Sequence, residues 1–198
     1  MRWLMTHSLL SSWLYQFDAY EDYAEKAKAD FLAVLRREPR EASEAMQRGN
    51  EFEQLVYDVC DCKADSSHQW YDAAAYIADS VRGGQRQLVA MKTVTIDGMD
   101  LLLYGRIDCL KAGTVYDIKY TGSYAVGKYI ASTQHPMYLE LIPEASRFIY
   151  AVSNGRNAYL ETYRRDEVKP IQPLIQDFLT YLRGNGLLEV YREMWRSR

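Results

Sequence analysis

Apolar residues recur along this chain with two different spacings. Up to about residue 81 they return every three to four residues, which is typical of amphipathic helices. This spacing predicts helices over about 9–37, 43–60 and 68–81, separated by Pro39 and a polar stretch. Ser8, or the Ser11-Ser12 pair, is the candidate N-cap of the first helix.

From about residue 87 the apolar positions alternate, which is typical of half-buried strands. Asp97-Gly98 and Asn154-Gly155 are hairpin turn sequences between such strands. The expected strands cover 87–96, 99–110, 114–120, 147–153 and 158–163. Further helices are expected over about 133–141, 167–183 and 187–195.

This order of elements predicts an α/β fold, a helix–sheet–helix sandwich with one mixed sheet. The length of 198 residues fits one domain. We expect its core at about 43–163, with helical additions over 1–42 and 164–198.

Composition narrows the class of protein. The three cysteines, an odd number, do not suggest a disulfide framework, and the spacing of Cys60, Cys62 and Cys109 is poor for a metal cluster. Free thiols in a reducing cytoplasm are expected. No apolar window approaches a membrane span, and the first residues lack a signal-peptide pattern. The net charge of −3 neither favours nor excludes binding to nucleic acid.

The most informative segment is a short hairpin that carries charged residues. If Ala112-Gly113 form a two-residue loop, Asp108 lies directly opposite Asp117, and Lys119 projects from the same face as Asp117. Opposed carboxylates about 5 Å apart repel each other unless a cation lies between them. The hairpin is therefore a candidate seat for a divalent metal, although an ordinary solvated strand face explains the charges equally well.

The opposite face of this hairpin is expected to be apolar. It carries Ile107, Cys109, Tyr116 and Ile118.

Two helices could add polar groups to this hairpin. Glu53 shares a side of its helix with Val56 and Tyr57, and we prefer it to Glu51 as a third acidic ligand. Gln134 and Tyr138 are four residues apart, so they share a face near a helix N-terminus, where phosphate is favoured.

Other chemistries lack support in the sequence. The histidines His7, His68 and His135 are scattered singly, and none completes a triad with a nucleophile. There is no P-loop and no dinucleotide-binding glycine pattern.

Together these residues resemble the PD-(D/E)XK nuclease superfamily, and within it the RecB-like branch that includes lambda-type exonucleases. The similar elements are Gly49-x-x-x-Glu53, Gly105-Arg106-Ile107-Asp108, Asp117-Ile118-Lys119 and Gln134-His135-Pro136-Met137-Tyr138, in the family's order. The resemblance implies a restriction-endonuclease-like core and metal-dependent hydrolysis of DNA phosphodiester bonds.

The resemblance also implies roles for individual residues. Asp108, Asp117, the Ile118 carbonyl and Glu53 would bind one or two Mg²⁺ or Mn²⁺ ions. Lys119 would act on the attacking water or the phosphate, and Gln134 and Tyr138 would order the site or the DNA backbone. Arg106 and Lys128 are weaker candidates for phosphate contacts.

The chain departs from the family in two ways. No histidine accompanies the first motif, and no cysteine follows Cys109, so no iron–sulfur cluster is expected. The partners implied are DNA, as single strands or duplex ends, and a recombination protein; recombination, repair or phage DNA processing would be the setting. Two rival interpretations remain: a catalytically silent nuclease fold that binds DNA or a protein, and an enzyme acting on a small phosphoester.

Overall fold

The computed structural model describes residues 1–197, apart from the side chain of Glu21. Its helices are α1 (His7–Asp18), α2 (Glu21–Leu35), α3 (Glu44–Cys60), α4 (Tyr71–Val81), α5 (Gln134–Leu141), α6 (Gln172–Gly184) and α7 (Leu188–Met194). Its strands are β1 (Arg2–Thr6), β2 (Gln85–Ile96), β3 (Met99–Lys111), β4 (Thr114–Tyr120), β5 (Arg147–Ser153) and β6 (Ala158–Arg164).

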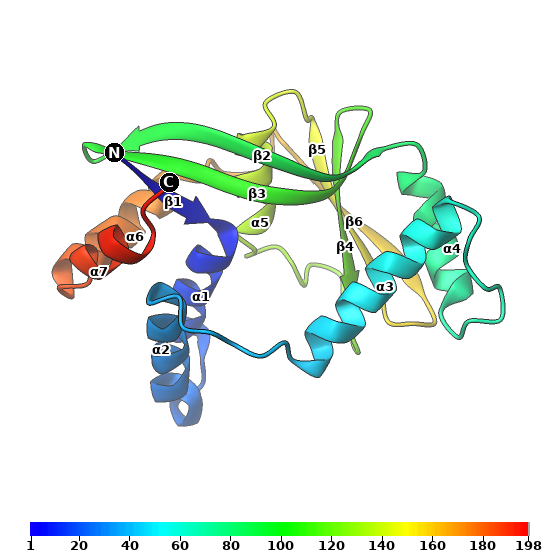
Figure 1. Ribbon diagram of the computed structural model, residues 1–198, viewed down its shortest axis with the longest axis horizontal. Coiled ribbons are helices and arrows are strands. Elements are labelled where there is room, and N and C mark those ends of the chain that lie inside the picture. Colours follow the sequence, from blue (N-terminus) through cyan, green and yellow to red (C-terminus); the bar gives the residue numbers. More distant parts are fainter. Residues whose placement is uncertain (198) are drawn as a thin grey trace.

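The strands form one mixed sheet in the order β1-β3-β4-β5-β6, with β2 paired to β3. The β1–β3 and β4–β5 pairs are parallel, and the other pairs are antiparallel. Helices flank the sheet, with α3 and α4 gathered at one end and α1, α2, α6 and α7 at the other (Figure 1). The expected α/β class with a mixed central sheet is therefore confirmed.

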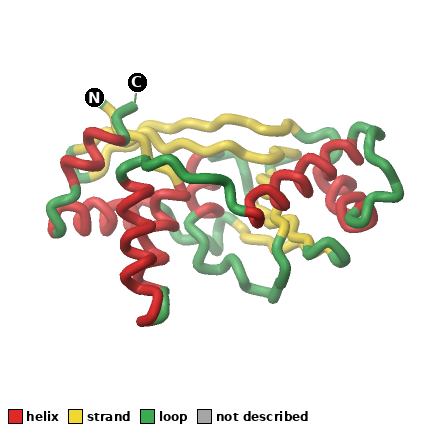
Figure 2. The backbone as a smooth tube through the Cα atoms, turned by 60° about the horizontal axis from the view of Figure 1, so that its bottom comes forward, coloured by secondary structure: helices red, strands yellow, loops and turns green. Residues whose placement is uncertain are grey.

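Two hydrophobic clusters hold the helices to the sheet. The larger includes Leu9 of α1, Leu103 of β3, Met137 of α5 and Phe178 of α6. The smaller joins α3 and α4 to the neighbouring strands through residues such as Phe52, Ile77, Cys109 and Ile118. Figure 2 shows the long β2–β3 ribbon lying along one side of the molecule, with the helices projecting away from it.

The first strand and the first helix differ from expectation. Residues 2–6 form β1, which the sequence pattern did not reveal because five residues are too few to show alternation clearly. The expected helix over 9–37 is two helices, with extended backbone at Ala19 and Tyr20 between them. Thr6, not a serine, caps α1 by accepting a hydrogen bond from the Leu9 amide at 3.3 Å.

The break lets α2 fold back, so that Phe31 and Leu35 become fully buried in the larger cluster. Other bounds shift less: β2 begins at Gln85 and not at 87, α4 begins at Tyr71 and not at 68, and α6 begins at Gln172 and not at 167.

The long strand β3 has an unpaired stretch on one edge. Its pairing with β1 ends at Tyr104, and its pairing with β4 covers only residues 109–111. On that edge, residues 105–108 have no strand partner in the described chain, so β3 and β4 separate there. This separation opens the sheet beside the Gly105-Arg106-Ile107-Asp108 segment.

The regular alternation of β3 also fails in this stretch. Ile107 packs in the larger cluster, whereas Cys109, Tyr116 and Ile118 belong to the smaller one on the other side of the sheet. The expectation that all four share one face is therefore wrong. The β2–β3 ladder likewise omits the pair between Asp108 and Gln87, and Gln87 has a φ of 51°. At Gln87 and Asp108 the regular alternation of side chains between the two faces of the sheet is thus interrupted.

Gly105 offers a test of the packing beside the opening. A Cβ at Gly105 would lie 2.6 Å from Cε1 of Tyr138 and 2.9 Å from Cδ1 of Leu141. We predict that Gly105→Ala lowers the free energy of unfolding in urea by about 1–3 kcal/mol, the usual cost of overpacking.

Gly49→Ala is the matched control, because nothing lies within 4 Å of a Cβ at that helical position. It should stabilise the chain by up to about 1 kcal/mol, since alanine is the better helix former. Equal stability of Gly105→Ala and the wild type would contradict this view of the packing.

Candidate functional site

The opening of the sheet is the base of a cleft of about 680 Å³. Its walls come from the β1–α1 junction, α3, β3, β4 and the first turns of α5. The residues predicted from the sequence all line this one cleft: Glu53, Asp108, Asp117, Ile118, Lys119, Gln134 and Tyr138. Residues separated by more than 80 positions along the chain therefore meet at one place.

Asp108 lies where β3 and β4 part. The two-residue loop is as expected, with Lys111 opposite Thr114, but the ladder ends at the Cys109–Tyr116 pair, one pair before Asp108 and Asp117. The Asp108 carboxylate takes over the missing contact, because its Oδ2 accepts a hydrogen bond from the Ile118 amide at 2.8 Å. Asp108 therefore binds β4 through its side chain.

The Asp108 carboxyl is electrostatically unfavourable. Burial raises its pKa well above the usual range, and the charges of Asp117 and Glu53 raise it further. The Ile118 amide and the Lys119 ammonium oppose this shift without cancelling it. The raised pKa of Asp108 thus reflects a buried carboxyl group with two other acidic groups nearby.

Asp117 is 2% exposed, and its two oxygens have different surroundings. Oδ1 accepts a hydrogen bond from the side-chain amide of Gln134. Oδ2 lies 2.7 Å from Nζ of Lys119, within ion-pair distance. Oδ2 is buried and, apart from the Lys119 ammonium, has no hydrogen-bond partner in residues 1–197.

Lys119 is held in its charged form. Burial would lower the pKa of its ammonium, but the carboxylates of Asp117 and Asp108 outweigh burial, and the pKa is raised. About a third of the side chain, 32%, is exposed to the cleft. The ammonium can therefore donate hydrogen bonds to a molecule that enters.

Glu53 reaches the cleft from α3, whereas Glu51 lies outside it, 3.9 Å from Nε2 of His68. Oε1 of Glu53 accepts hydrogen bonds from the Tyr57 hydroxyl at 2.8 Å and from the Gln87 amide. The Tyr57 hydroxyl also lies 2.9 Å from the Asp108 carbonyl oxygen, and its single proton serves one of the two acceptors at a time.

The three carboxylates share one feature. Each has one oxygen fixed by an N–H donor: Asp108 by the Ile118 amide, Asp117 by Gln134 and Glu53 by Gln87. No cage of three or more His, Cys, Asp or Glu side chains is preformed in residues 1–197. Mg²⁺ does not need such a cage, since it is usually bound by one or two carboxylates and keeps several waters. Oδ2 of Asp117, whose partner in residues 1–197 is the Lys119 ammonium alone, lies near a second aspartate and fits such an ion.

Gln134 and Tyr138 of α5 form hydrogen bonds with residues at the opening of the sheet. Tyr138 donates a hydrogen bond to the Arg106 carbonyl at 2.9 Å, which satisfies part of the unpaired edge of β3. Burial, with a contribution from Asp117, raises the pKa of Tyr138 to about 12, so it remains a donor. Gln134 thus holds the Asp117 carboxylate, and Tyr138 holds β3, the strand that carries Asp108.

Sequence reasoning missed three residues of this region. His7 lines the cleft, and its ring lies edge-on to Tyr138 at 5.5 Å. Burial, with a smaller contribution from Lys119, lowers the pKa of His7 to about 4, so the imidazole is neutral at pH 7. Tyr57 is four residues from Glu53 on α3, a spacing that could have revealed it, whereas the contacts of Gln87 depend on the tertiary structure. A glutamine at the start of a strand gives no signal in the sequence.

The two weaker candidates have different positions. Arg106 lines the cleft and also an adjoining groove of about 370 Å³ that runs past Glu53, Tyr57 and Gln87. Lys128 instead donates hydrogen bonds within its own loop, to the Thr121 hydroxyl and the Ser123 carbonyl.

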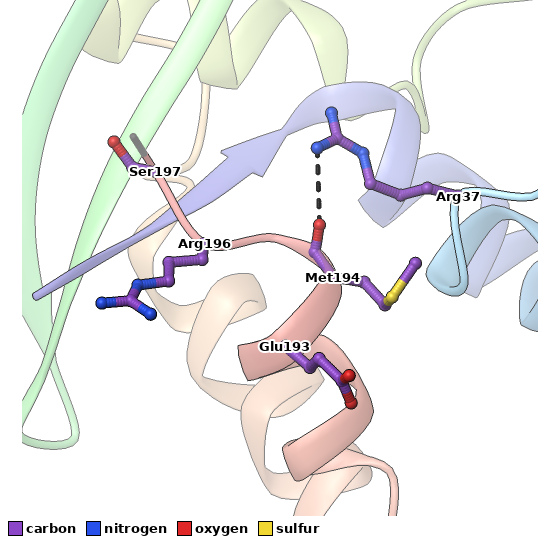
Figure 3. Close-up of a pocket in the computed structure, with 5 residues that line it drawn as sticks. All are labelled: Arg37, Glu193, Met194, Arg196 and Ser197. Carbon is purple, nitrogen blue, oxygen red and sulfur yellow. Dashed lines mark hydrogen bonds between the residues drawn. The ribbon is translucent and has the colours of Figure 1, made fainter.

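A second cavity, of about 540 Å³, lies near the C-terminal end of the described chain. Figure 3 shows Arg37 reaching over it to donate a hydrogen bond to the Met194 carbonyl. It contains none of the residues predicted from the sequence, and among residues 1–197 Glu193 is the one acidic side chain that lines it. The candidate site is therefore the cleft at the sheet opening.

Comparison with known proteins supports the fold. No family model and no curated protein matches this sequence. Among solved structures, a protein called SSO0001 matches with a TM-score of 0.54 and 14% identity, over 91% of this chain and 77% of that one. LHK-Exo in complex with dAMP matches with a TM-score of 0.50 and 16% identity, over 96% and 91%.

At such identities the likeness is one of fold, and this chain shares its α/β fold with a protein named as an exonuclease. No helix in residues 1–197 is long and apolar enough to cross a lipid bilayer.

The raised pKa of Asp108 predicts a dependence of stability on pH. The folded state binds the Asp108 proton more tightly than the unfolded state does, where the pKa is about 3.9. The resulting stabilisation of the fold is fully present below that pH and is lost as the pH rises through the folded-state pKa. Asp108→Asn removes the charge and keeps an oxygen for the Ile118 amide. In EDTA at pH 8 it should melt higher than the wild type, with the difference shrinking towards pH 4.

Asp177→Asn, at an exposed position of α6, is the control and should change the melting temperature little at any pH. An Asp108→Asn variant that melts below the wild type throughout this range would show that the carboxylate is not strained.

Proposed function

We propose that this chain is a divalent-metal-dependent nuclease that hydrolyses DNA phosphodiester bonds. We place it in the RecB-like branch of the PD-(D/E)XK superfamily, as an exonuclease acting in recombination, repair or phage DNA processing. One observation carries the proposal most: two buried aspartates and a charged lysine meet in one cleft, where Oδ2 of Asp117 has only the Lys119 ammonium as a partner in residues 1–197.

The ligand set proposed for Mg²⁺ or Mn²⁺ is Asp108, Asp117, the Ile118 carbonyl and Glu53. Hard cations prefer oxygen donors of this kind, and each of the three carboxylates has one oxygen not occupied by its N–H donor. When bound, such an ion supplies Lewis-acid polarisation of a phosphate and makes water a better nucleophile near neutral pH.

Lys119 is proposed as the catalytic cation. Because its pKa is raised, the ammonium keeps its proton and acts as a donor and not as a base. From its place beside Oδ2 of Asp117 it would orient the attacking water and stabilise the negative charge that develops on the phosphate. Gln134 and Tyr138 would keep Asp117 and the edge of β3 in place during the reaction.

DNA is proposed as the substrate on two grounds. LHK-Exo, which shares the fold, is named as an exonuclease and was solved in complex with dAMP. The cleft continues into the groove past Arg106, an exposed cation that could contact a phosphate of an extended strand. The Arg106 contact would contribute to binding more than to chemistry.

Removal of the charged groups should abolish cleavage. We predict that Lys119→Met and Asp117→Asn each lower the rate of digestion of end-labelled linear DNA, with Mg²⁺ or Mn²⁺, by at least about 100-fold. Lys169→Met, at an exposed lysine away from the cleft, should match the wild type. Digestion at the wild-type rate by Lys119→Met would remove Lys119 from the mechanism.

The exonuclease assignment predicts a need for DNA ends. Linear duplex should be degraded to nucleotides, while covalently closed circular DNA of the same sequence stays intact. Nicking or linearisation of the circle would indicate an endonuclease. Binding of DNA without cleavage under any metal condition would favour the catalytically silent module.

A further inference from the structure

Gln87 has an unusual backbone conformation next to the candidate site. Its φ of 51° lies in the left-handed region, which costs a residue other than glycine about 1–3 kcal/mol. It is opposite Asp108 in the β2–β3 register, at the one pair that the ladder omits. Such strain persists only where surrounding contacts hold the residue in place.

The contacts of Gln87 lead towards the acidic residues. Its side-chain amide donates hydrogen bonds to Oε1 of Glu53 and, at 3.1 Å, to the Tyr57 hydroxyl. That hydroxyl lies 2.8 Å from the same Glu53 oxygen and 2.9 Å from the Asp108 carbonyl. Burial raises the pKa of Tyr57, so its hydroxyl stays protonated and remains a donor. Gln87 therefore connects β2, α3 and β3 across the edge of the cleft.

Both donors reach the same oxygen of Glu53. Oε1 accepts from Gln87 and Tyr57, whereas no donor in the described chain reaches Oε2. A carboxylate fixed at one oxygen presents the other in a defined direction, which is how outer residues commonly orient metal ligands. Gln134 does the same for Asp117, where Oδ1 is fixed and Oδ2 faces the Lys119 ammonium.

We propose that Gln87 is a positioning residue that holds Glu53 by Oε1 so that Oε2 is presented to a divalent cation in the cleft. The proposal rests on the function proposed above and assigns the strained backbone a purpose. The positive φ thus occurs at the residue whose amide reaches Glu53 on α3.

Gln87→Gly separates this role from a merely structural one. Glycine adopts a positive φ without strain, so the variant loses the amide while the backbone is relieved. Its melting temperature in EDTA should equal or exceed that of the wild type. Its affinity for Mn²⁺ alone, measured by calorimetric titration, should fall by about 10-fold or more, as is typical when such a supporting residue is removed.

Ala112→Gly is the matched backbone control. Ala112 has a φ of 48° in the exposed β3–β4 turn, and the substitution relieves a similar conformation without removing any polar group. It should leave the Mn²⁺ affinity unchanged. If Ala112→Gly weakens Mn²⁺ binding as much as Gln87→Gly does, backbone relief and not the amide is responsible, and the proposal fails.

A double-mutant cycle tests whether Gln87 acts through Glu53. In a Glu53→Gln background, Gln87→Gly should have no further effect on Mn²⁺ affinity, because the carboxylate that it orients is gone. An undiminished effect in that background would overturn the proposal, as would a Gln87→Gly variant that binds Mn²⁺ like the wild type.

Failure of the proposed function has a different signature. If the wild type and Asp117→Asn bind Mn²⁺ equally or not at all, the metal site itself is wrong, and the role of Gln87 falls with it. If binding depends on Asp117 but not on Gln87, only the positioning role is lost.

Discussion

The structure depends on the separation of β3 from β4 after only three residue pairs. Up to Cys109 and Tyr116 the two strands share an ordinary ladder, and beyond that pair side chains replace the backbone contacts. Asp108 accepts the hydrogen bond of the Ile118 amide, and Tyr138 donates to the Arg106 carbonyl. The backbone groups left unpaired where the strands separate thus form hydrogen bonds with side chains that line the cleft. The same hydrogen bonds therefore stabilise the fold and shape the site.

The separation also concentrates negative charge away from water. Burial raises the pKa of Asp108, and the charges of Asp117 and Glu53 raise it further. Lys119 offsets part of this shift, and its ammonium, 2.7 Å away, is the only partner of Oδ2 of Asp117 in residues 1–197. One ammonium beside several buried carboxyl groups leaves negative charge that a divalent cation would offset. The unfavourable arrangement is what makes the cleft a plausible place for hard-cation chemistry and not a solvated strand face.

The hairpin, the mixed sheet and the α/β class could be predicted because local signals determine them. Ala112-Gly113 forms a two-residue loop with positive φ at both residues, and alternation marks the central strands. The break at Ala19 and Tyr20 had no glycine or proline to signal it, and β1 is too short to show a period. The position of Glu53 on its helix already suggested that it could reach the hairpin, and the family resemblance supported this, whereas His7 and Gln87 enter only through tertiary contacts. Gln87 in particular is at a position where the strand pair switches faces, which alternation cannot anticipate.

The position of a bound metal tests the proposed site most directly. Crystals of the wild-type protein grown or soaked with Mn²⁺ would reveal the ion in an anomalous difference map. We expect a peak in the cleft at about 2.1 Å from Oδ2 of Asp117, with an oxygen of Asp108 as a second ligand. Crystals in which Mn²⁺ occupies other places while Asp108 and Asp117 remain without it would contradict a metal site in this cleft.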